Sequence, residues 1–215
     1  MTNSEILSHI DHTLLRPTST TEEIDALCEE AVRLKTASVC IPPSYVRHVN
    51  EKYPGLNICT VIGFPLGYNT TAVKCFEAQD AIKNGASEID MVIDLGWVKN
   101  GELDAVENEI VEVRKACGDH ILKVIIETCY LTDEEKMALC GCVTRAGADY
   151  IKTSTGFGTA GATLADIQLF SRNIGGNVKM KAAGGVKTRE DLEMFLSAGC
   201  ERIGTSSAVR LLEEK

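Results

Sequence analysis

The sequence lacks the features that mark membrane, secreted and nucleic-acid-binding proteins. No apolar run approaches the roughly 18 residues that a membrane span needs, and the first residues have no basic, apolar signal layout. Basic residues are in the minority, 22 Lys plus Arg against 31 Asp plus Glu. The net charge of −9 disfavours nucleic acid and anionic membranes, whose binding depends on positive potential. We therefore expect a soluble, cytoplasmic protein that binds any anionic ligand in a local positive pocket.

Metal-binding patterns are also missing. The nine cysteines include no C-x-x-C, and the four histidines show no H-x-x-x-H spacing. Cys40 and Cys59 lie in apolar runs, where a reduced thiol serves as a small hydrophobic group. We interpret His12 as a hydrogen-bonded residue at a strand end. The sequence thus predicts no metal and no cofactor.

Short β-branched runs alternate with longer amphipathic segments along the chain. Eight runs predict strands, at residues 10–14, 38–41, 58–64, 88–94, 121–128, 150–154, 178–183 and 202–205. Threonines placed three residues before an acidic residue predict helix starts, at Thr20, Thr132, Thr163 and Thr188. Glycines after helical runs predict helix ends, at Gly85, Gly118, Gly147 and Gly199.

This alternation favours parallel β/α units in an α/β fold. At about 27 residues per unit, a (β/α)8 TIM barrel fits the length of the chain. The alternative, an open doubly wound sheet, would need a glycine-rich first turn, and G-x-G-x-x-G is absent. We expect residues 1–215 to form a single barrel domain.

An internal repeat supports the barrel. The pattern G-[AC]-x-x-I-x occurs at residues 85–90, 147–152 and 199–204, each time leading from a helix end into a strand. Because alternate strands of a barrel supply the same layer, Asp90, Lys152 and Gly204 are expected at one height. If they face inward, that layer holds a carboxylate, an ammonium group and a gap. The alternative is that the repeat reflects turn geometry alone and that the polar residues face the helices.

Four lysines lie in strand-like runs: Lys123, Lys152, Lys179 and Lys181. Lys179 and Lys181 share one face of their strand, but Lys181 is nearer the carboxyl end, where barrels place their active sites. Lys152 and Lys181 at neighbouring strand ends, with Asp90 alongside, suit Schiff-base chemistry. A lysine attacks a carbonyl only when unprotonated, and burial and a second cation both favour that form. Asp90 would then move protons.

Two glycine-rich segments match the phosphate site of barrel enzymes. Gly184–Lys187 follows the seventh predicted strand and Gly204–Ser207 ends the eighth, where barrels commonly bind phosphate through backbone N–H groups. Lys187 would supply local positive charge. The binding residues expected here are Gly184, Gly185, Lys187, Gly204, Thr205 and Ser206.

Six motifs in order along the chain resemble the deoxyribose-phosphate aldolase family. They are I-D-H-T-L-L (10–15), V-I-G-F-P-L-G (61–67), E-I-D-M-V-I (88–93), K-V-I-I-E-T (123–128), I-K-T-S-T-G-F (151–157) and K-A-A-G-G-V (181–186). The resemblance covers nearly the whole chain. It implies a class I aldolase that reversibly splits 2-deoxy-D-ribose 5-phosphate into D-glyceraldehyde 3-phosphate and acetaldehyde, in deoxyribose phosphate catabolism.

The same resemblance implies roles for individual residues. Lys152 would form the Schiff base, Lys181 would be the cation that favours its unprotonated form, and Asp90 would transfer protons. Pocket-lining positions of the family fall on Asp11, Thr13, Cys40 and Thr153. The implied partners are a sugar phosphate and an aldehyde, and small barrels of this kind often pair, so a homodimer or homotetramer is expected.

Two positions depart from the family pattern. Some members carry a phosphate-contacting lysine five residues after the Schiff-base lysine, where this chain has Phe157, and some end in a tail with a terminal tyrosine, where this chain reads L-L-E-E-K. The first departure concerns dependence on phosphate and the second proton transfer. The alternatives are another Schiff-base barrel, of the transaldolase or keto-acid aldolase kind, and a non-catalytic sugar-phosphate-binding barrel or redox-responsive thiol protein. Lys181 beside Lys152 favours an enzyme, because a mere binder does not need the second lysine.

Overall fold

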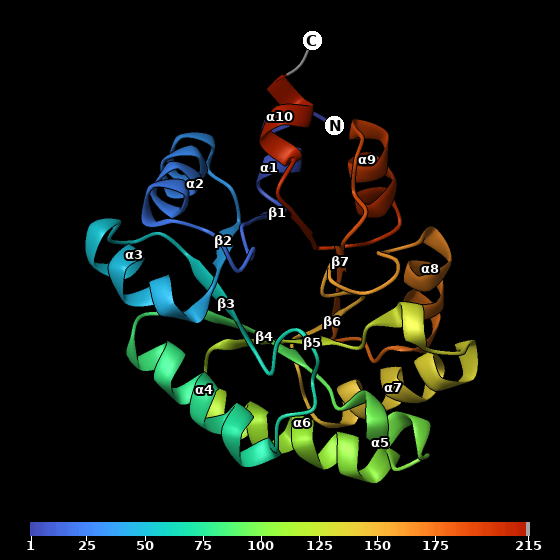
Figure 1. Ribbon diagram of the computed structural model, residues 1–215. Helices are drawn as coiled ribbons and strands as arrows, with labels where there is room; N and C mark the ends of the chain where they lie inside the picture. Colours follow the sequence, from blue (N-terminus) through green and yellow to red (C-terminus); the bar gives the residue numbers. More distant parts are fainter. Residues whose placement is uncertain (214–215) are drawn as a thin grey trace.

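The computed structural model describes residues 1–213, which form a closed barrel of eight parallel strands (Figure 1). Each strand pairs with the next in chain order, and the eighth pairs with the first. The strands are β1 (Ile10–Thr13), β2 (Ser38–Ile41), β3 (Ile58–Ile62), β4 (Glu88–Val92), β5 (Ile121–Ile125), β6 (Tyr150–Lys152), β7 (Lys179–Ala183) and β8 (Arg202–Thr205). The predicted TIM barrel is confirmed, and the open-sheet alternative is wrong.

Helices surround the barrel as an outer ring, and α10 lies beside α1 (Figure 1). They are α1 (Asn3–Leu7), α2 (Thr21–Leu34), α3 (Val46–Lys52), α4 (Thr71–Lys83), α5 (Leu95–Lys99), α6 (Leu103–Cys117), α7 (Asp133–Arg145), α8 (Leu164–Asn173), α9 (Arg189–Ser197) and α10 (Ala208–Glu213). Short 3-10 turns cover Pro43–Tyr45 and Thr128–Tyr130. Within residues 1–213, these helices are all too short or too polar to cross a membrane.

The predicted helix signals are largely confirmed. Three threonine caps form complete capping boxes, Thr20–Glu23, Thr132–Glu135 and Thr188–Asp191. Thr163 forms only half of one: its hydroxyl accepts a hydrogen bond from the Asp166 N–H at 3.1 Å. The Asp166 carboxylate instead pairs with Lys136 at 2.7 Å, which ties α8 to α7.

Several strands end earlier than the sequence suggests. The predicted runs 58–64, 88–94, 121–128 and 150–154 stop two or three residues short, at Ile62, Val92, Ile125 and Lys152. The backbone turns out of the sheet there: Gly63 has φ +58° and Glu127 has φ +52°, both left-handed. The remaining apolar residues of these runs belong to loops at the carboxyl end of the barrel.

The two faces of each strand have different neighbours. In β4, Ile89 and Met91 belong to the large apolar core, while Glu88 and Asp90 point into the barrel, where they meet charged side chains from other strands. Barrel interiors are usually filled by Val, Ile and Leu. This barrel therefore has its apolar core between strands and helices and a charged centre.

Candidate active site

Seven charged side chains meet inside the barrel. They are Asp11 (β1), Glu88 and Asp90 (β4), Lys123 (β5), Lys152 (β6), Lys181 (β7) and Arg202 (β8). We call them the charge cluster. With every group ionised it holds four cations and three carboxylates, an excess of one positive charge. Buried charges need partners, so the distribution of contacts within the cluster decides its chemistry.

Asp90 lies at the centre of the charge cluster. Its Oδ2 accepts hydrogen bonds from Lys152 and from Lys181, each at 2.7 Å, and its Oδ1 accepts one from Lys123 at 2.8 Å. Burial raises the pKa of Asp90, but the three ammonium groups outweigh it and hold this pKa well below its ordinary value. Asp90 is therefore ionised at neutral pH.

Lys181 is held by two carboxylates, since its Nζ contacts both Asp11 and Asp90. Burial lowers the pKa of Lys181, but the two carboxylates outweigh it and raise the pKa above its ordinary value. Lys181 therefore stays protonated. A Cβ at Gly204 would lie 3.2 Å from Cε of Lys181, so the glycine leaves space for this side chain.

Glu88 pairs with two cations of the charge cluster, Lys123 and Arg202. Glu88 Oε2 lies 2.6 Å from Lys123 Nζ, and its Oε1 accepts from Arg202 at 2.9 Å. Arg202 also reaches Asp11, which in turn accepts from the Ser38 hydroxyl at 2.8 Å. Burial lowers the pKa of Lys123 and of Arg202, but the facing carboxylates outweigh it and raise both.

Lys152 differs from the other cations of the charge cluster. Within residues 1–213, Asp90 is its one carboxylate partner, whereas the other three cations each contact at least two carboxylates. Lys152 and Lys181 are direct neighbours in the β6–β7 register. Lys179, by contrast, is exposed and lies near Glu201 at the amino end of β7.

A cavity of about 440 Å³ opens beside Lys152. Its lining comes from the loops after β1, β6, β7 and β8: residues 13–16, Lys152, 155–157, 183–186 and 204–207. Of the expected site residues it includes Thr13, Lys152, Gly184, Gly185, Gly204, Thr205 and Ser206. Both predicted glycine segments, apart from Lys187, therefore line the cavity, at the carboxyl end of the barrel.

Other expected site residues lie outside the cavity lining. Asp11 belongs to the charge cluster beneath it, and Cys40 is buried beside Cys59 of the neighbouring strand. The Thr153 hydroxyl accepts from the Ala183 N–H at 3.1 Å and so joins β6 to β7. Lys187 is exposed, and its backbone N–H donates to Asp191 at 2.9 Å.

The last position of each repeat, Asp90, Lys152 and Gly204, faces the interior of the barrel. Asp90 and Lys152 bond to each other inside the barrel, and Gly204 faces Lys181. The alternative in which these residues face the helices is wrong. His12 does face outward: its Nε2 lies 2.8 Å from Glu30 of α2, in agreement with the interpretation of a hydrogen-bonded strand residue.

Sequence reasoning missed several residues of the site. Glu88 and Arg202 complete the charge cluster, and both stand two residues before a repeat position already singled out, Asp90 or Gly204, so the period of two was the available signal. Arg16 lines the cavity without any motif to mark it. Lys123 was noted as a strand lysine, but no local pattern linked it to Asp90.

Glu127 fixes the loop between β6 and α8. Its side chain is buried, and its two carboxylate oxygens accept from the N–H and the hydroxyl of Thr155. The Thr155 hydroxyl also accepts from the Phe157 N–H at 3.0 Å. This contact holds the cavity wall formed by residues 155–157 in place.

Among the described residues, two groups of side chains in and beside the charge cluster have a donor set that could hold a metal. Cys40, Cys59 and Asp90 form one, and Asp11, Cys59 and Glu88 the other, with ligand atoms within 4.8 Å of one another. Lys123 Nζ, however, lies 3.2 Å from Cys59 Sγ and 2.8 Å from Asp90. An ammonium group therefore already supplies the positive charge that these ligands would offer to a metal.

Comparison with known proteins agrees with this geometry. Residues 6–208 match the family described as DeoC/LacD family aldolase. A deoxyribose-phosphate aldolase of Clostridium botulinum (strain Alaska E43 / Type E3) is 58% identical over 214 residues, which cover 99% of this chain and 97% of that protein. The one from Clostridioides difficile (strain 630) is 57% identical over 211 residues, 98% of this chain and 96% of that protein.

A solved structure extends the likeness to the fold. The deoxyribose phosphate aldolase of Aeropyrum pernix, described as having a unique tetrameric structure, superposes with a TM-score of 0.89 at 33% identity. The match covers 99% of this chain and 91% of that one. With its (β/α)8 barrel, its interior lysines and these relatives, the chain belongs to the DeoC/LacD family of aldolases.

Proposed function

We propose that this aldolase reversibly cleaves 2-deoxy-D-ribose 5-phosphate into D-glyceraldehyde 3-phosphate and acetaldehyde, through a Schiff base on Lys152, in deoxyribose phosphate catabolism. The names of the relatives support the substrate. One observation carries the lysine: of the four cations in the charge cluster, Lys152 alone lines the cavity, and it has the fewest carboxylate partners.

The charge balance distinguishes Lys152 from the other cations of the charge cluster. If Lys152 loses its proton, the remaining three cations match the three carboxylates of the charge cluster. Lys123, Lys181 and Arg202 are each held protonated by two or more carboxylates, and the pKa of each is raised. Among the described residues, Lys152 is therefore the cation of the charge cluster with the fewest carboxylate partners.

The reaction then follows from an unprotonated amine. Lys152 Nζ adds to the C1 aldehyde of the open-chain sugar, and loss of water gives the iminium. When the C3 hydroxyl loses its proton, the C2–C3 bond breaks, glyceraldehyde 3-phosphate leaves, and the bonding pair stays on C2 as an enamine. Protonation of C2 and addition of water release acetaldehyde and regenerate the lysine.

Asp90 and Lys181 supply the proton path. Asp90 Oδ2 lies 2.7 Å from both Nζ atoms, so a proton leaving Lys152 meets an ionised carboxylate that is already bonded to Lys181. Lys181 holds this carboxylate in its ionised form and repels a proton on Lys152. The substrate-binding roles of Thr13, Gly184, Gly185, Gly204, Thr205 and Ser206 belong to the same proposal, because these residues line the cavity above Lys152.

Trapping with borohydride tests the proposal. Acetaldehyde and borohydride should add one ethyl group, which peptide mapping finds on Lys152, and Lys152→Leu should abolish both labelling and cleavage. Lys179→Gln is the matched control, because Lys179 is an exposed lysine on the strand next to β6 and should leave the label in place. A label on Lys123 or Lys181, or none, would contradict the assignment.

Assembly and compartment complete the proposal. We propose a homodimer or homotetramer, supported by the tetrameric relative and by the apolar side chains of Tyr68 and Phe76, which are 70% and 69% exposed. Light scattering of the purified protein tests it. The nine free cysteines support a reducing, cytoplasmic compartment.

A further inference from the structure

The charges around the cavity all have one sign. Among the residues that the structure describes, Arg16 and Lys152 are the only charged side chains that line it, and both are cationic. The chain as a whole carries −9. A lining with cations and no carboxylates is the kind of site where an acidic protein can bind an anionic ligand.

Arg16 lies in the loop between β1 and α2, three residues after Thr13. Its side chain is 60% exposed, and its Nη2 donates to Oε1 of Glu23 at 2.8 Å. Glu23 is anchored separately, because its Oε2 accepts from the Thr20 N–H in the capping box at 3.0 Å. An exposed ion pair of this kind contributes little stability, so Arg16 can leave Glu23 for a stronger anion.

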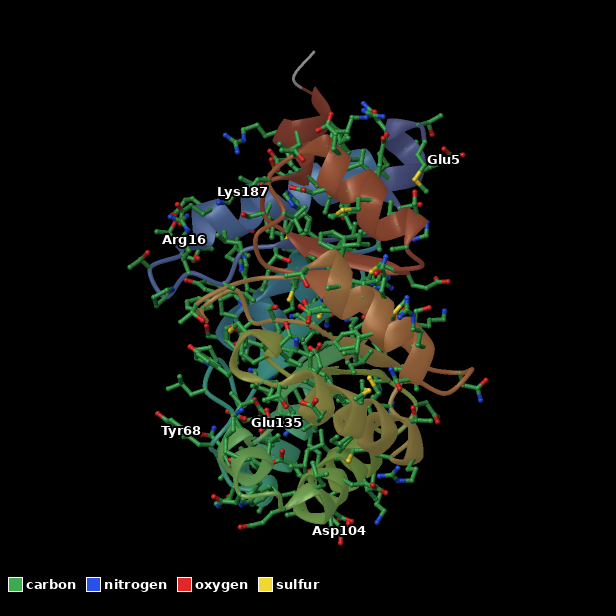
Figure 2. All side chains as sticks on the ribbon, turned by 90° about the vertical axis from the view of Figure 1, so that its right-hand side faces the viewer. Glu5, Arg16, Tyr68, Asp104, Glu135 and Lys187 are labelled. Carbon is green, nitrogen blue, oxygen red and sulfur yellow. The ribbon has the colours of Figure 1, made fainter. Side chains whose placement is uncertain are left out.

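The other places where a phosphate-binding cation was expected do not supply one. Phe157, at the position where some family members have lysine, lines the cavity with its ring packed edge-to-face on Phe64 at 5.4 Å between centroids. Lys187 is outside the lining, although Figure 2 shows it on the same side of the molecule as Arg16. The lining residues after β6 therefore include no cation, and the cation comes from the loop after β1.

We propose that Arg16 binds the phosphate group of the sugar phosphate, exchanging Glu23 for the phosphate when substrate enters the cavity. This rests on the proposed function. The planar guanidinium donates two parallel hydrogen bonds to phosphate oxygens, which a single ammonium group cannot match. Arg16 thus sets the preference for phosphorylated over unphosphorylated sugar that Phe157 does not provide.

The test compares kcat/KM for 2-deoxyribose 5-phosphate and for 2-deoxyribose. In Arg16→Gln the ratio of the two values should fall roughly 5- to 30-fold, through KM for the phosphorylated sugar, as expected for a charged hydrogen bond at a partly exposed site. Arg16→Lys should recover part of the ratio. Arg145→Gln is the matched control, because Arg145 forms a similar exposed pair with Glu107 on α6, away from the cavity.

A second variant tests the exchange. Glu23→Gln keeps the capping box, since glutamine serves at that position, but removes the anion that competes for Arg16. It should lower KM for the phosphorylated sugar about two- to fivefold. An unchanged ratio in Arg16→Gln, or a fall equal to that in Arg145→Gln, would overturn the inference. Wild-type protein that cleaves neither sugar would instead overturn the proposed function.

Discussion

Replacing Lys181 with leucine tests the charge balance of the barrel interior. The substitution removes one cation at nearly constant volume and leaves three cations facing three carboxylates, so the charge cluster is neutral with Lys152 protonated. In the wild type, the charge cluster has one cation more than it has carboxylates. Lys181→Leu should therefore make the unprotonated amine scarcer near neutral pH.

The size of the effect follows from the geometry. Lys152 and Lys181 each lie 2.7 Å from the same oxygen of Asp90, so the two nitrogens are at most twice that distance apart. Two unit charges at that separation repel by about 3 kcal/mol at an effective dielectric of about 20. This corresponds to about two pH units. We expect the midpoint of imine formation to move to higher pH by about one to two units, because relaxation of Asp90 offsets part of the loss.

The assay is the rate of borohydride trapping with acetaldehyde as a function of pH. In Lys181→Leu the rate near pH 7.5 should fall and rise about tenfold per unit toward pH 9–10, whereas Lys181→Arg keeps the cation and the wild-type midpoint. Asp11→Asn should shift the pH midpoint of trapping in the opposite direction. It removes a carboxylate that contacts Lys181 and Arg202, but not Lys152, and so increases the excess positive charge of the charge cluster. Its midpoint should move to lower pH.

A Lys181→Leu profile that keeps the wild-type midpoint and is merely scaled down would refute this reasoning. Lys181 would then act on protons directly, without changing the protonation of Lys152. Circular dichroism at each pH shows whether the variant is folded, so that a loss of structure is not taken for a loss of imine formation.

Further predictions concern the rest of the molecule. Asp90→Asn should lower turnover by roughly 10²–10⁴-fold, the usual range for loss of a general base, while trapping on the lysine persists; unchanged turnover would leave Asp90 a structural ion-pair partner. Lys74→Met should lower the free energy of unfolding in urea by about 3–5 kcal/mol, because it leaves the buried Glu109 carboxylate, 2.7 Å from Lys74 Nζ, without its cation. Burial already raises the pKa of Glu109. Adding Glu109→Leu should recover most of the lost stability. Folding lowers the pKa of Asp90, so the stability that Asp90 contributes is present above about pH 4 and is lost as the pH falls through its pKa in the folded protein. Folding raises the pKa of Lys123, so the stability that Lys123 contributes is present below about pH 10 and is lost only as the pH rises through its pKa in the folded protein. The urea midpoint should accordingly be flat near neutral pH and fall in acid. EDTA should leave cleavage unchanged, and a loss that zinc restores would point to a metal-dependent aldolase.

The barrel and its central lysines could be predicted because their signals are local. Strand positions follow from runs of apolar residues, and helix starts from caps such as Thr20 with Glu23, which need only neighbouring residues to form. The repeat places Asp90 and Lys152 at equal offsets from their helix ends. In a parallel barrel equal offsets mean equal height, so their common layer could be inferred before the fold was known.

The partners within the charge cluster depended on the closed barrel. Glu88 and Arg202 are 114 residues apart, and they meet because closure sets the register between distant strands across the interior. Strand patterns show which face a residue takes, but not which strand faces it across the barrel. For that reason Lys123 could be recognised as unusual but not connected to Asp90.

The tertiary structure alone decided which cation reaches the cavity. Lys187 stood beside the glycine motif and looked like the source of positive charge, while Arg16 stood in a segment without a motif. Loop conformations follow from specific contacts, such as the Asp191 carboxylate that holds the Lys187 N–H and the Glu23 carboxylate that pairs with Arg16. The sequence pattern places Glu23 and Asp191 at helix starts, but it does not show which loop side chain reaches the cavity. The strands and helices of this protein were therefore determined by its sequence pattern, and the lining of its cavity by three-dimensional packing.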